Sequence, residues 1–208
     1  MGRWADAEQM LRALAESDLE AGCEVVTPCL AAFAGEHPRF LAFVRPFEAG
    51  GYVAPLTELL ALAVPLCADR LAFSVSGRAW SLEDPIPPVT AEVDLRQRVV
   101  CIELVDSGDG RLRRTSVLLP YDLPPDAPAG SSAGIRPGIR WGQRQSLPGG
   151  DGWIGEALTY AVSAPARRAM RAPDELIARQ ALRVAALGHG LLLAEDVAGR
   201  LGLPARPA

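Results

Sequence analysis

One stretch decides the class of fold: RVVCIELVDSGDGRLRRTSVLL, residues 98–119. It begins with apolar and β-branched residues from Val99 to Val105, continues with the turn sequence Ser107-Gly108-Asp109-Gly110, and returns through alternating apolar positions to Leu119. Two β-rich segments joined by a short glycine-containing loop are typical of a β-hairpin. We therefore expect an antiparallel pair of strands at about 98–119.

A second period-two pattern precedes this stretch, with Leu71, Phe73 and Val75 alternating with smaller residues. Strict alternation over several residues indicates a half-buried strand. The dipeptide Ser76-Gly77 favours a tight turn. We therefore expect another hairpin at about 71–82.

Helical spacing dominates the N-terminal third. Apolar residues recur at helical intervals from Trp4 to Leu14, and Gly22 is a suitable stop. A second helical pattern starts near Pro28 and continues, with a break, to Val44. A third helix is expected to start at Pro55, since proline suits the first turn of a helix.

Three helices are also expected at the C-terminal end. The first starts at Trp153, the second starts at Pro173 and continues through Leu191, and the last covers Glu195–Leu201. Strands that are grouped between helices favour an α+β fold over alternating βαβ units. The predicted architecture has N-terminal helices, a small and mainly antiparallel sheet, and C-terminal helices packed on it.

The chain has 208 residues, which is enough for one hydrophobic core. We expect a single globular domain, 1–208, with an irregular loop at about 120–152, where six prolines and seven glycines occur. A short strand is expected within this loop, at 139–141. Long irregular loops in compact domains are usually functional or disordered.

The composition excludes several kinds of chemistry. All 21 basic residues are arginine, and the chain has neither lysine nor asparagine. A lysine Schiff base, a P-loop lysine and a cysteine–histidine–asparagine triad are therefore excluded. Each positive charge is a planar guanidinium that binds carboxylate or phosphate through two hydrogen bonds. If a ligand binds, we expect it to be a small anion held by arginine.

The composition and the apolar segments also indicate the source and the cellular location of the protein. Codons for lysine and asparagine are AT-rich, so their absence favours a bacterial source with a GC-rich genome. The N-terminal residues do not resemble a secretion signal, and the longest apolar stretch, Leu59 to Ala68, is too short to span a bilayer. We expect a cytoplasmic protein with free cysteines and no membrane partner.

Two glycine-containing motifs match common catalytic patterns without the context that they need. Gly130–Gly134 fits G-x-S-x-G but lies in a proline-rich segment rather than between a strand and a helix. Gly150–Gly155 fits G-x-G-x-x-G but no strand precedes it. We interpret the first as a flexible loop and the second as a turn into a helix.

Metal and nucleic-acid binding are not expected. The four cysteines form no C-x-x-C pair, and His37 and His189 are the only histidines. We interpret His189 as a packed, hydrogen-bonded histidine. The segment at 194–203 resembles the first helix of a helix-turn-helix, but too few residues follow for a recognition helix, and the net charge is −4. We predict no cofactor.

Candidate binding residues stand out on the predicted sheet and on the loop that follows it. Glu103 is a carboxylate in the middle of an apolar strand, and a cross-strand arginine such as Arg113 or Arg114 could pair with it. Arginine and tryptophan, which are favoured in interface hot spots, occur together twice. The candidate set is Arg78, Trp80, Glu103, Arg114, Arg140 and Trp141.

Function stays open between three hypotheses. The first is a binding or interaction protein, accessory to a protein partner or self-associating, because no set of acid–base or nucleophilic residues is visible. The second is a small metal-independent enzyme that uses carboxylates and arginines on the sheet. The third is a self-assembling structural subunit.

Overall fold

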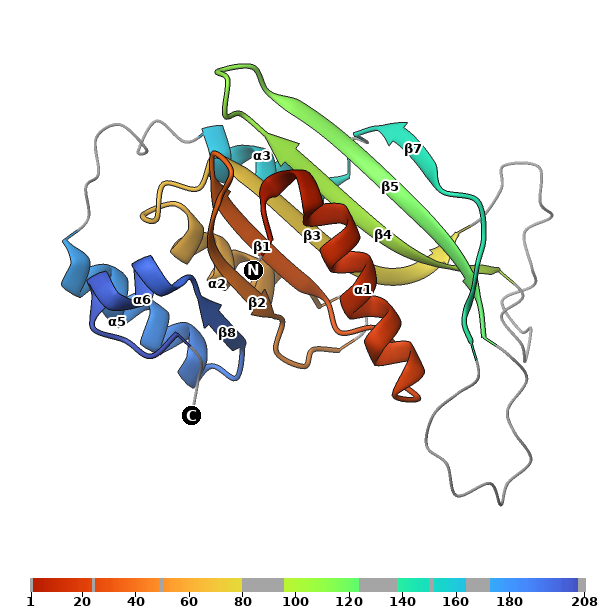
Figure 1. Ribbon diagram of the computed structural model, residues 1–208, viewed down its shortest axis with the longest axis horizontal. Helices are drawn as coiled ribbons and strands as arrows, with labels where there is room; N and C mark the ends of the chain where they lie inside the picture. The colour runs from red at the N-terminus through yellow and green to blue at the C-terminus, as the bar shows by residue number, and fades with distance from the viewer. Residues whose placement is uncertain are drawn as a thin grey trace.

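In the computed structural model, helices cover both faces of an antiparallel sheet (Figure 1). The structure describes residues 2–23, 25–48, 51–79, 96–123, 138–149, 152–163 and 173–205. Of the eight strands in these residues, seven follow the order β6-β5-β4-β3-β1-β2-β8, and the eighth, β7, pairs with β5 outside this path. The predicted α+β class, with helices at both ends of the chain, is confirmed.

The elements have the following bounds. The strands are β1 (Cys29–Ala34), β2 (His37–Phe43), β3 (Arg70–Ala79), β4 (Gln97–Asp106), β5 (Arg113–Asp122), β6 (Arg140–Trp141), β7 (Gln145–Pro148) and β8 (Gly190–Leu193). The helices are η1 (Trp4–Asp6), α1 (Ala7–Glu20), α2 (Val53–Ala63), α3 (Trp153–Ser163), α5 (Asp174–Ala186) and α6 (Glu195–Leu201).

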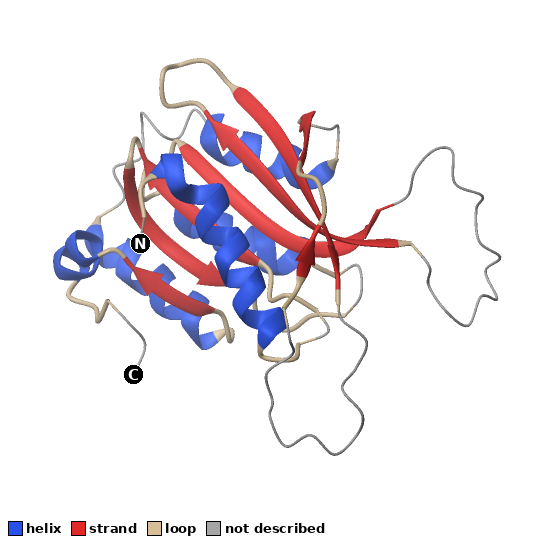
Figure 2. Cartoon of the chain, turned by 45° about the vertical axis from the view of Figure 1, so that its right-hand side comes forward, coloured by secondary structure: helices blue, strands red, loops and turns tan. Residues whose placement is uncertain are grey.

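Two hydrophobic cores lie on opposite faces of the sheet. Helix α1 covers one face and buries Leu11, Ala15 and Leu19, which recur every fourth residue and so form one side of the helix. Helices α2, α3 and α5 cover the other face, and helices are seen on both sides of the sheet in Figure 2. On this second face, Phe73 of the central strand β3 is fully buried. Each strand in the middle of the sheet therefore carries buried side chains on both faces.

The hairpin expected at 98–119 is confirmed by β4 and β5. Their register pairs Val105 with Arg114 and Val99 with Pro120. Because successive side chains point to opposite faces, Val100 and Ile102 face α1 while Val105 faces α3. This alternation positions every candidate residue on the two strands.

The expected hairpin at 71–82 is wrong in its turn. Strand β3 continues through Ser76-Gly77 and pairs with β4 along its whole length, from Arg70 opposite Asp106 to Ala79 opposite Gln97. Glycine adopts extended backbone as readily as it forms a turn, so the dipeptide alone does not distinguish a hairpin turn from a continuous strand. Residues 80–82, assigned to the return strand, lie outside the described residues.

The second N-terminal helix is also wrong, because residues 28–44 form the β1–β2 hairpin. Its turn contains Gly35, whose φ is +59°, a left-handed conformation that suits glycine. Leu30 packs into one core and Phe33 into the other. A strand buried on both faces has a continuous apolar sequence, which periodicity does not distinguish from a buried helix.

The helix expected from Pro173 through Leu191 is too long. Helix α5 ends at Ala186, and Gly188 follows with a φ of +95°. The chain then forms β8, which pairs with β2 at the edge of the sheet, before α6 begins as expected. The helix at Trp153 and the short strand at 139–141 are confirmed as α3 and β6.

Candidate functional site

A cavity of about 270 Å³ lies at the end of the sheet where β3 and β5 finish and β4 begins, and we call it the arginine pocket. The residues that line it are Val25, Ser76, Gly77, Arg78, Arg98 and Tyr121. Val25 is 68% exposed. The cavity therefore opens to solvent.

Sheet register brings the polar side chains of the pocket together. Arg78 at the end of β3 is the register partner of Arg98 at the start of β4. Because Val99 pairs with Pro120, the next position outward places Arg98 beside Tyr121. Tyr121 in turn pairs with Trp141 of β6. These four side chains form a row across four strands, on the face that carries α1.

The phenol of Tyr121 is held in its protonated form. Burial raises the pKa of Tyr121, and the nearby positive charges of Arg98 and Arg78 oppose this shift without reversing it. The guanidinium of Arg98, on the neighbouring strand, lies close enough for its positive charge to act on the phenol. A protonated phenol can donate its proton to an acceptor in the pocket.

The two arginine side chains of the pocket have different neighbours. Nη1 of Arg78 donates to the backbone carbonyl of Arg96 at 3.0 Å, which orients the guanidinium at the strand end. Arg98 lies beside Tyr121 across the β4–β5 pair. Guanidinium groups bind oxyanions with charge-assisted hydrogen bonds that are stronger than neutral ones. The arrangement is chemically suited to a carboxylate or a phosphate.

Two other candidates, Arg140 and Trp141, lie in β6 next to the pocket. The ring of Trp141 lies 5.7 Å from that of Tyr121, and its Nε1 donates to Glu16 of α1 at 3.3 Å. The guanidinium of Arg12 lies 4.8 Å from the centre of the same ring. Arg140 is exposed opposite Asp122. Trp141 therefore supports the wall of the pocket, and Trp80 lies outside the described residues.

The segment 140–148, which contains β6 and β7, is attached to α1 mainly by polar contacts. Nε and Nη2 of Arg144 donate to the two oxygens of Glu8 at 2.5 and 2.7 Å. Glu8, Arg12 and Glu16 recur every fourth residue, so the contacts that α1 makes with Arg144 and Trp141 come from one side of the helix. This clamp positions Trp141 against Tyr121.

Glu8→Gln should loosen segment 140–148 while leaving the rest of the fold intact. Both side chains of the ion pair are partly exposed to solvent, so its loss should lower the free energy of unfolding by less than about 1 kcal/mol. We expect the amides of β7 to exchange up to about fivefold faster, since each lost interaction speeds local opening. Hydrogen exchange followed by mass spectrometry measures this. Asp109→Asn, which breaks an exposed pair with Arg113 in the β4–β5 turn, is the matched control. Equal exchange of β7 in all three proteins would contradict the clamp.

Glu103 and Arg114 lie on the opposite face from the arginine pocket, beneath α3. Ser116 is the register partner of Glu103 and donates its hydroxyl proton to the carboxylate, with oxygen distances of 2.7 and 2.8 Å. Arg114 packs so closely against α3 that a Cβ at Gly155 would collide with its guanidinium. These two candidates are therefore part of the packing between sheet and helix and do not join Arg78.

The thiol nearest to Glu103 is poorly suited to nucleophilic chemistry. Burial and the adjacent Glu103 carboxylate raise the pKa of Cys101 to about 12. The thiolate is the reactive form of cysteine, so Cys101 is almost entirely unreactive thiol at neutral pH. Its role is that of a small packed side chain in β4.

A third polar cluster, Arg45–Glu58–His189, joins the loop after β2, helix α2 and the residue just before β8. Glu58 accepts from Nε and Nη2 of Arg45 at 2.9 and 3.1 Å and lies 2.8 Å from Nε2 of His189. The backbone N–H of Arg45 donates to Nδ1 of His189 at 3.2 Å, so Nε2 carries the ring proton. The prediction of a packed, hydrogen-bonded His189 is confirmed, since its side chain is fully buried.

Glu58 should make stability depend on pH in the acid range. Hydrogen bonds from Arg45 lower the pKa of Glu58 from 4.5 to about 2, against the opposing effect of burial. A lowered pKa in the folded state stabilises the protein above the ordinary value, and this contribution disappears as pH falls from 4.5 towards 2. We expect urea unfolding to show a shallower acid loss in Glu58→Gln than in the wild type. The exposed Glu175→Gln should keep the wild-type slope. Identical slopes in wild type and Glu58→Gln would contradict the assignment.

Arg98 and Tyr121 were missed by the sequence interpretation. The signal was present, because both residues lie at nearly equal distances from the turn at 107–110 and a hairpin must bring them together. The described residues contain no group of three or more histidine, cysteine, aspartate or glutamate side chains that could hold a metal ion. None of the described helices is both long enough and apolar enough to span a bilayer.

Comparison with known proteins gives no family assignment. No protein-family model, no curated protein and no solved structure matches the chain. Function must therefore be argued from the geometry of the site alone.

Proposed function

We propose that the chain is a non-catalytic binding protein, a bacterial cytoplasmic accessory protein that holds an acidic group of a protein partner in the arginine pocket. The observation that carries the proposal is the placement of two arginines and a buried phenol around one small open cavity. The group recognised is an oxyanion, either a carboxylate or a phosphate.

The size of the pocket supports recognition of a single group. Pockets for drug-sized ligands have volumes of roughly 300–1,000 Å³, and the arginine pocket, at about 270 Å³, is smaller. A carboxylate or phosphate side chain fits such a volume, with the rest of the partner outside. Arginine and aromatic residues in one patch are also typical of the energetic centre of protein interfaces.

The enzymatic alternative depends on Glu103 and Arg114, and the described residues give it no specific support. Glu103 is held by Ser116, and Arg114 packs against α3. Catalysis requires a reactive group that can approach a substrate, such as a nucleophile beside a base. The buried thiol of Cys101 does not provide one. We therefore favour binding over catalysis.

Peptide titration tests the proposal. The probes are fluorescein-labelled heptapeptides that differ only at the central residue, which is glutamate, phosphoserine or glutamine, measured by anisotropy at low salt. We expect the glutamate or phosphoserine peptide to bind and the glutamine peptide to bind at least about tenfold more weakly, since hydrogen bonds to charged groups are the stronger ones. The tighter of the two anionic peptides identifies the group.

Two outcomes would contradict the proposal. One is binding of the glutamine peptide as tightly as the anionic peptides, which would show that the pocket does not recognise a negatively charged group. The other is tighter binding of a mixed-sequence DNA duplex than of either anionic peptide, which would assign the arginines to nucleic acid.

A further inference from the structure

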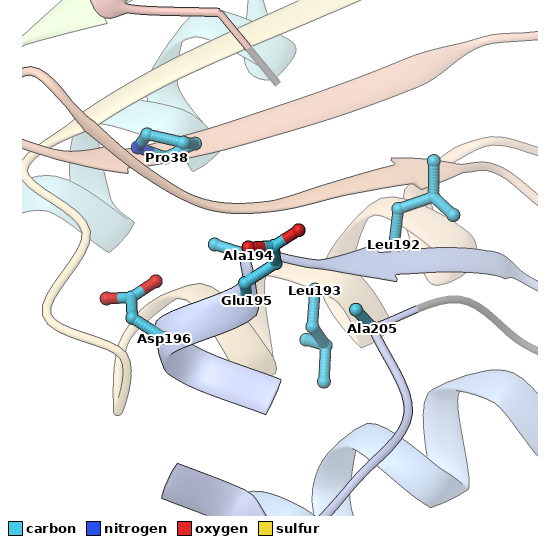
Figure 3. Close-up of a pocket in the computed structure, with 7 residues that line it drawn as sticks. All are labelled: Pro38, Leu192, Leu193, Ala194, Glu195, Asp196 and Ala205. Carbon is cyan, nitrogen blue, oxygen red and sulfur yellow. The ribbon is translucent and has the colours of Figure 1, made fainter. Parts of the chain in front are cut away.

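A larger groove, of about 490 Å³, lies at the opposite edge of the sheet from β6, along β8. The residues that line it are Pro38, Leu192, Leu193, Ala194, Glu195, Asp196 and Ala205. Figure 3 shows the side chains of Leu192 and Leu193 on β8, with Glu195 and Asp196 beside them at the start of α6. The groove therefore combines a sheet edge, two apolar side chains and two carboxylates.

The backbone of β8 has hydrogen-bonding groups that point away from the sheet. Strand β8 is the last strand in the sheet order, so only one of its sides faces a neighbour, β2. The N–H of Ala194 points towards β2 and donates to the carbonyl of Arg39. The N–H of Leu193 points away from the sheet and donates to the carbonyl of Ala205. Because backbone groups alternate along an antiparallel strand, the N–H and C=O of Leu191 point to the same outer side as those of Leu193.

The outward N–H of Leu193 already has a backbone acceptor, the carbonyl of Ala205. At 3.2 Å, this is one hydrogen bond from a short segment that follows α6. An edge strand with outward N–H and C=O groups is a template on which another extended chain adds as a new strand. A single hydrogen bond can be exchanged for one to an incoming chain without loss of the strand.

The charge of the groove indicates what kind of chain it takes. Glu195 is exposed, and the side chain of Asp196 is 67% exposed although it pairs with Arg39 at 3.2 Å. Both carboxylates lie within the lining of the groove, next to the outward side of β8. Positive side chains on an added strand would complement them, while negative ones would be repelled.

We propose that β8 is a strand-addition site, which takes an extended segment with alternating apolar and basic residues from another protein. The segment pairs with the outward groups of Leu191 and Leu193, replaces the Ala205 carbonyl at Leu193, and places basic side chains beside Glu195 and Asp196. This site is separate from the arginine pocket, and either proposal can fail without the other.

The test uses a labelled nine-residue peptide of alternating lysine and valine. We compare it with a version that has glutamate in place of lysine and a version that has proline in place of valine. The proline peptide keeps every positive charge but loses strand conformation and half of its amide donors. We expect the lysine–valine peptide to bind at least about tenfold more tightly than either control, because it alone has both backbone and charge complementarity. Amide exchange of Leu191 should slow when it binds.

Two variants of the chain locate the binding site. Glu195→Arg should lower the affinity for the lysine–valine peptide by about three- to tenfold. Glu156→Arg, a substitution at an exposed position on α3, should leave that affinity unchanged. A chain that ends at Leu203 lacks the Ala205 carbonyl and should bind about two- to tenfold more tightly, since one competing hydrogen bond is removed. Leu203 and Ala205 both pack against the core, and the truncated chain keeps Leu203, the larger of the two.

Three results would overturn the proposal. Equal binding of the lysine–valine and proline peptides would show that charge alone is responsible. An unchanged affinity in Glu195→Arg would place the peptide elsewhere. Absence of peptide binding together with a concentration-dependent dimer, in which the Leu191 amide becomes protected, would assign the edge to a second copy of the chain.

Discussion

Arg98→Gln should weaken binding of the anionic peptide by about 10–100-fold, which corresponds to the loss of hydrogen bonds to a charged group. Arg98 is the central residue of the arginine pocket, between Arg78 on β3 and Tyr121 on β5. Glutamine keeps much of the length and polarity of the side chain but has no charge. The substitution also removes one of the positive charges that act on the Tyr121 phenol. Anisotropy titration with the glutamate and phosphoserine peptides measures the change.

The matched control is Arg113→Gln, at the other end of the same hairpin. Its side chain is 61% exposed and pairs with Asp109, so it removes one positive charge without altering the pocket. We expect less than a threefold change in peptide affinity, because exposed charges are screened by solvent and salt. Equal losses in the two variants, with folding intact by circular dichroism, would show that net charge and not the pocket determines binding.

Phe73→Ala should lower the free energy of unfolding by about 3–5 kcal/mol, the range for removal of a large buried aromatic side chain. Phe73 is fully buried in β3, between β1 and β4, on the face covered by α2 and α3. The surrounding side chains belong to separate elements and cannot close the cavity completely. Urea unfolding measures the loss.

Leu147→Ala on β7 is the control for this stability prediction. Leu147 is 46% exposed, so its truncation should cost less than about 1 kcal/mol. A loss below about 1.5 kcal/mol in Phe73→Ala would contradict the position of Phe73 in a tightly packed core, since core truncations of this kind are consistently larger.

The sequence predicted those elements whose signal is local. The β4–β5 hairpin has strong alternation and a glycine-containing turn, and α1 and α3 have helical spacing, so all three were predicted correctly. Strands β1 and β2 were predicted as helix because both their faces are buried. Strand β8 was predicted as helix because only four residues of strand follow α5.

The binding site could be predicted only in part, because its geometry depends on the sheet order. Arg78 and Trp141 were predicted and lie at the pocket and beside it. Glu103 and Arg114 were grouped with them, but alternation along β4 and β5 places these two on the other face. The pairing of Arg78 with Arg98 required that β3 continue past Gly77, which the turn-like dipeptide hid.

The most direct test of the arginine pocket is an NMR titration that observes the Nε–H groups of the arginine side chains. Wild-type protein is titrated with the tighter of the glutamate and phosphoserine peptides, and Arg98→Gln and Tyr121→Phe spectra assign the signals. The proposed function predicts saturable shifts of the Arg78 and Arg98 signals, with little change at Arg113. Uniform small shifts of all arginines, or saturable shifts that leave Arg78 and Arg98 unaffected, would contradict it.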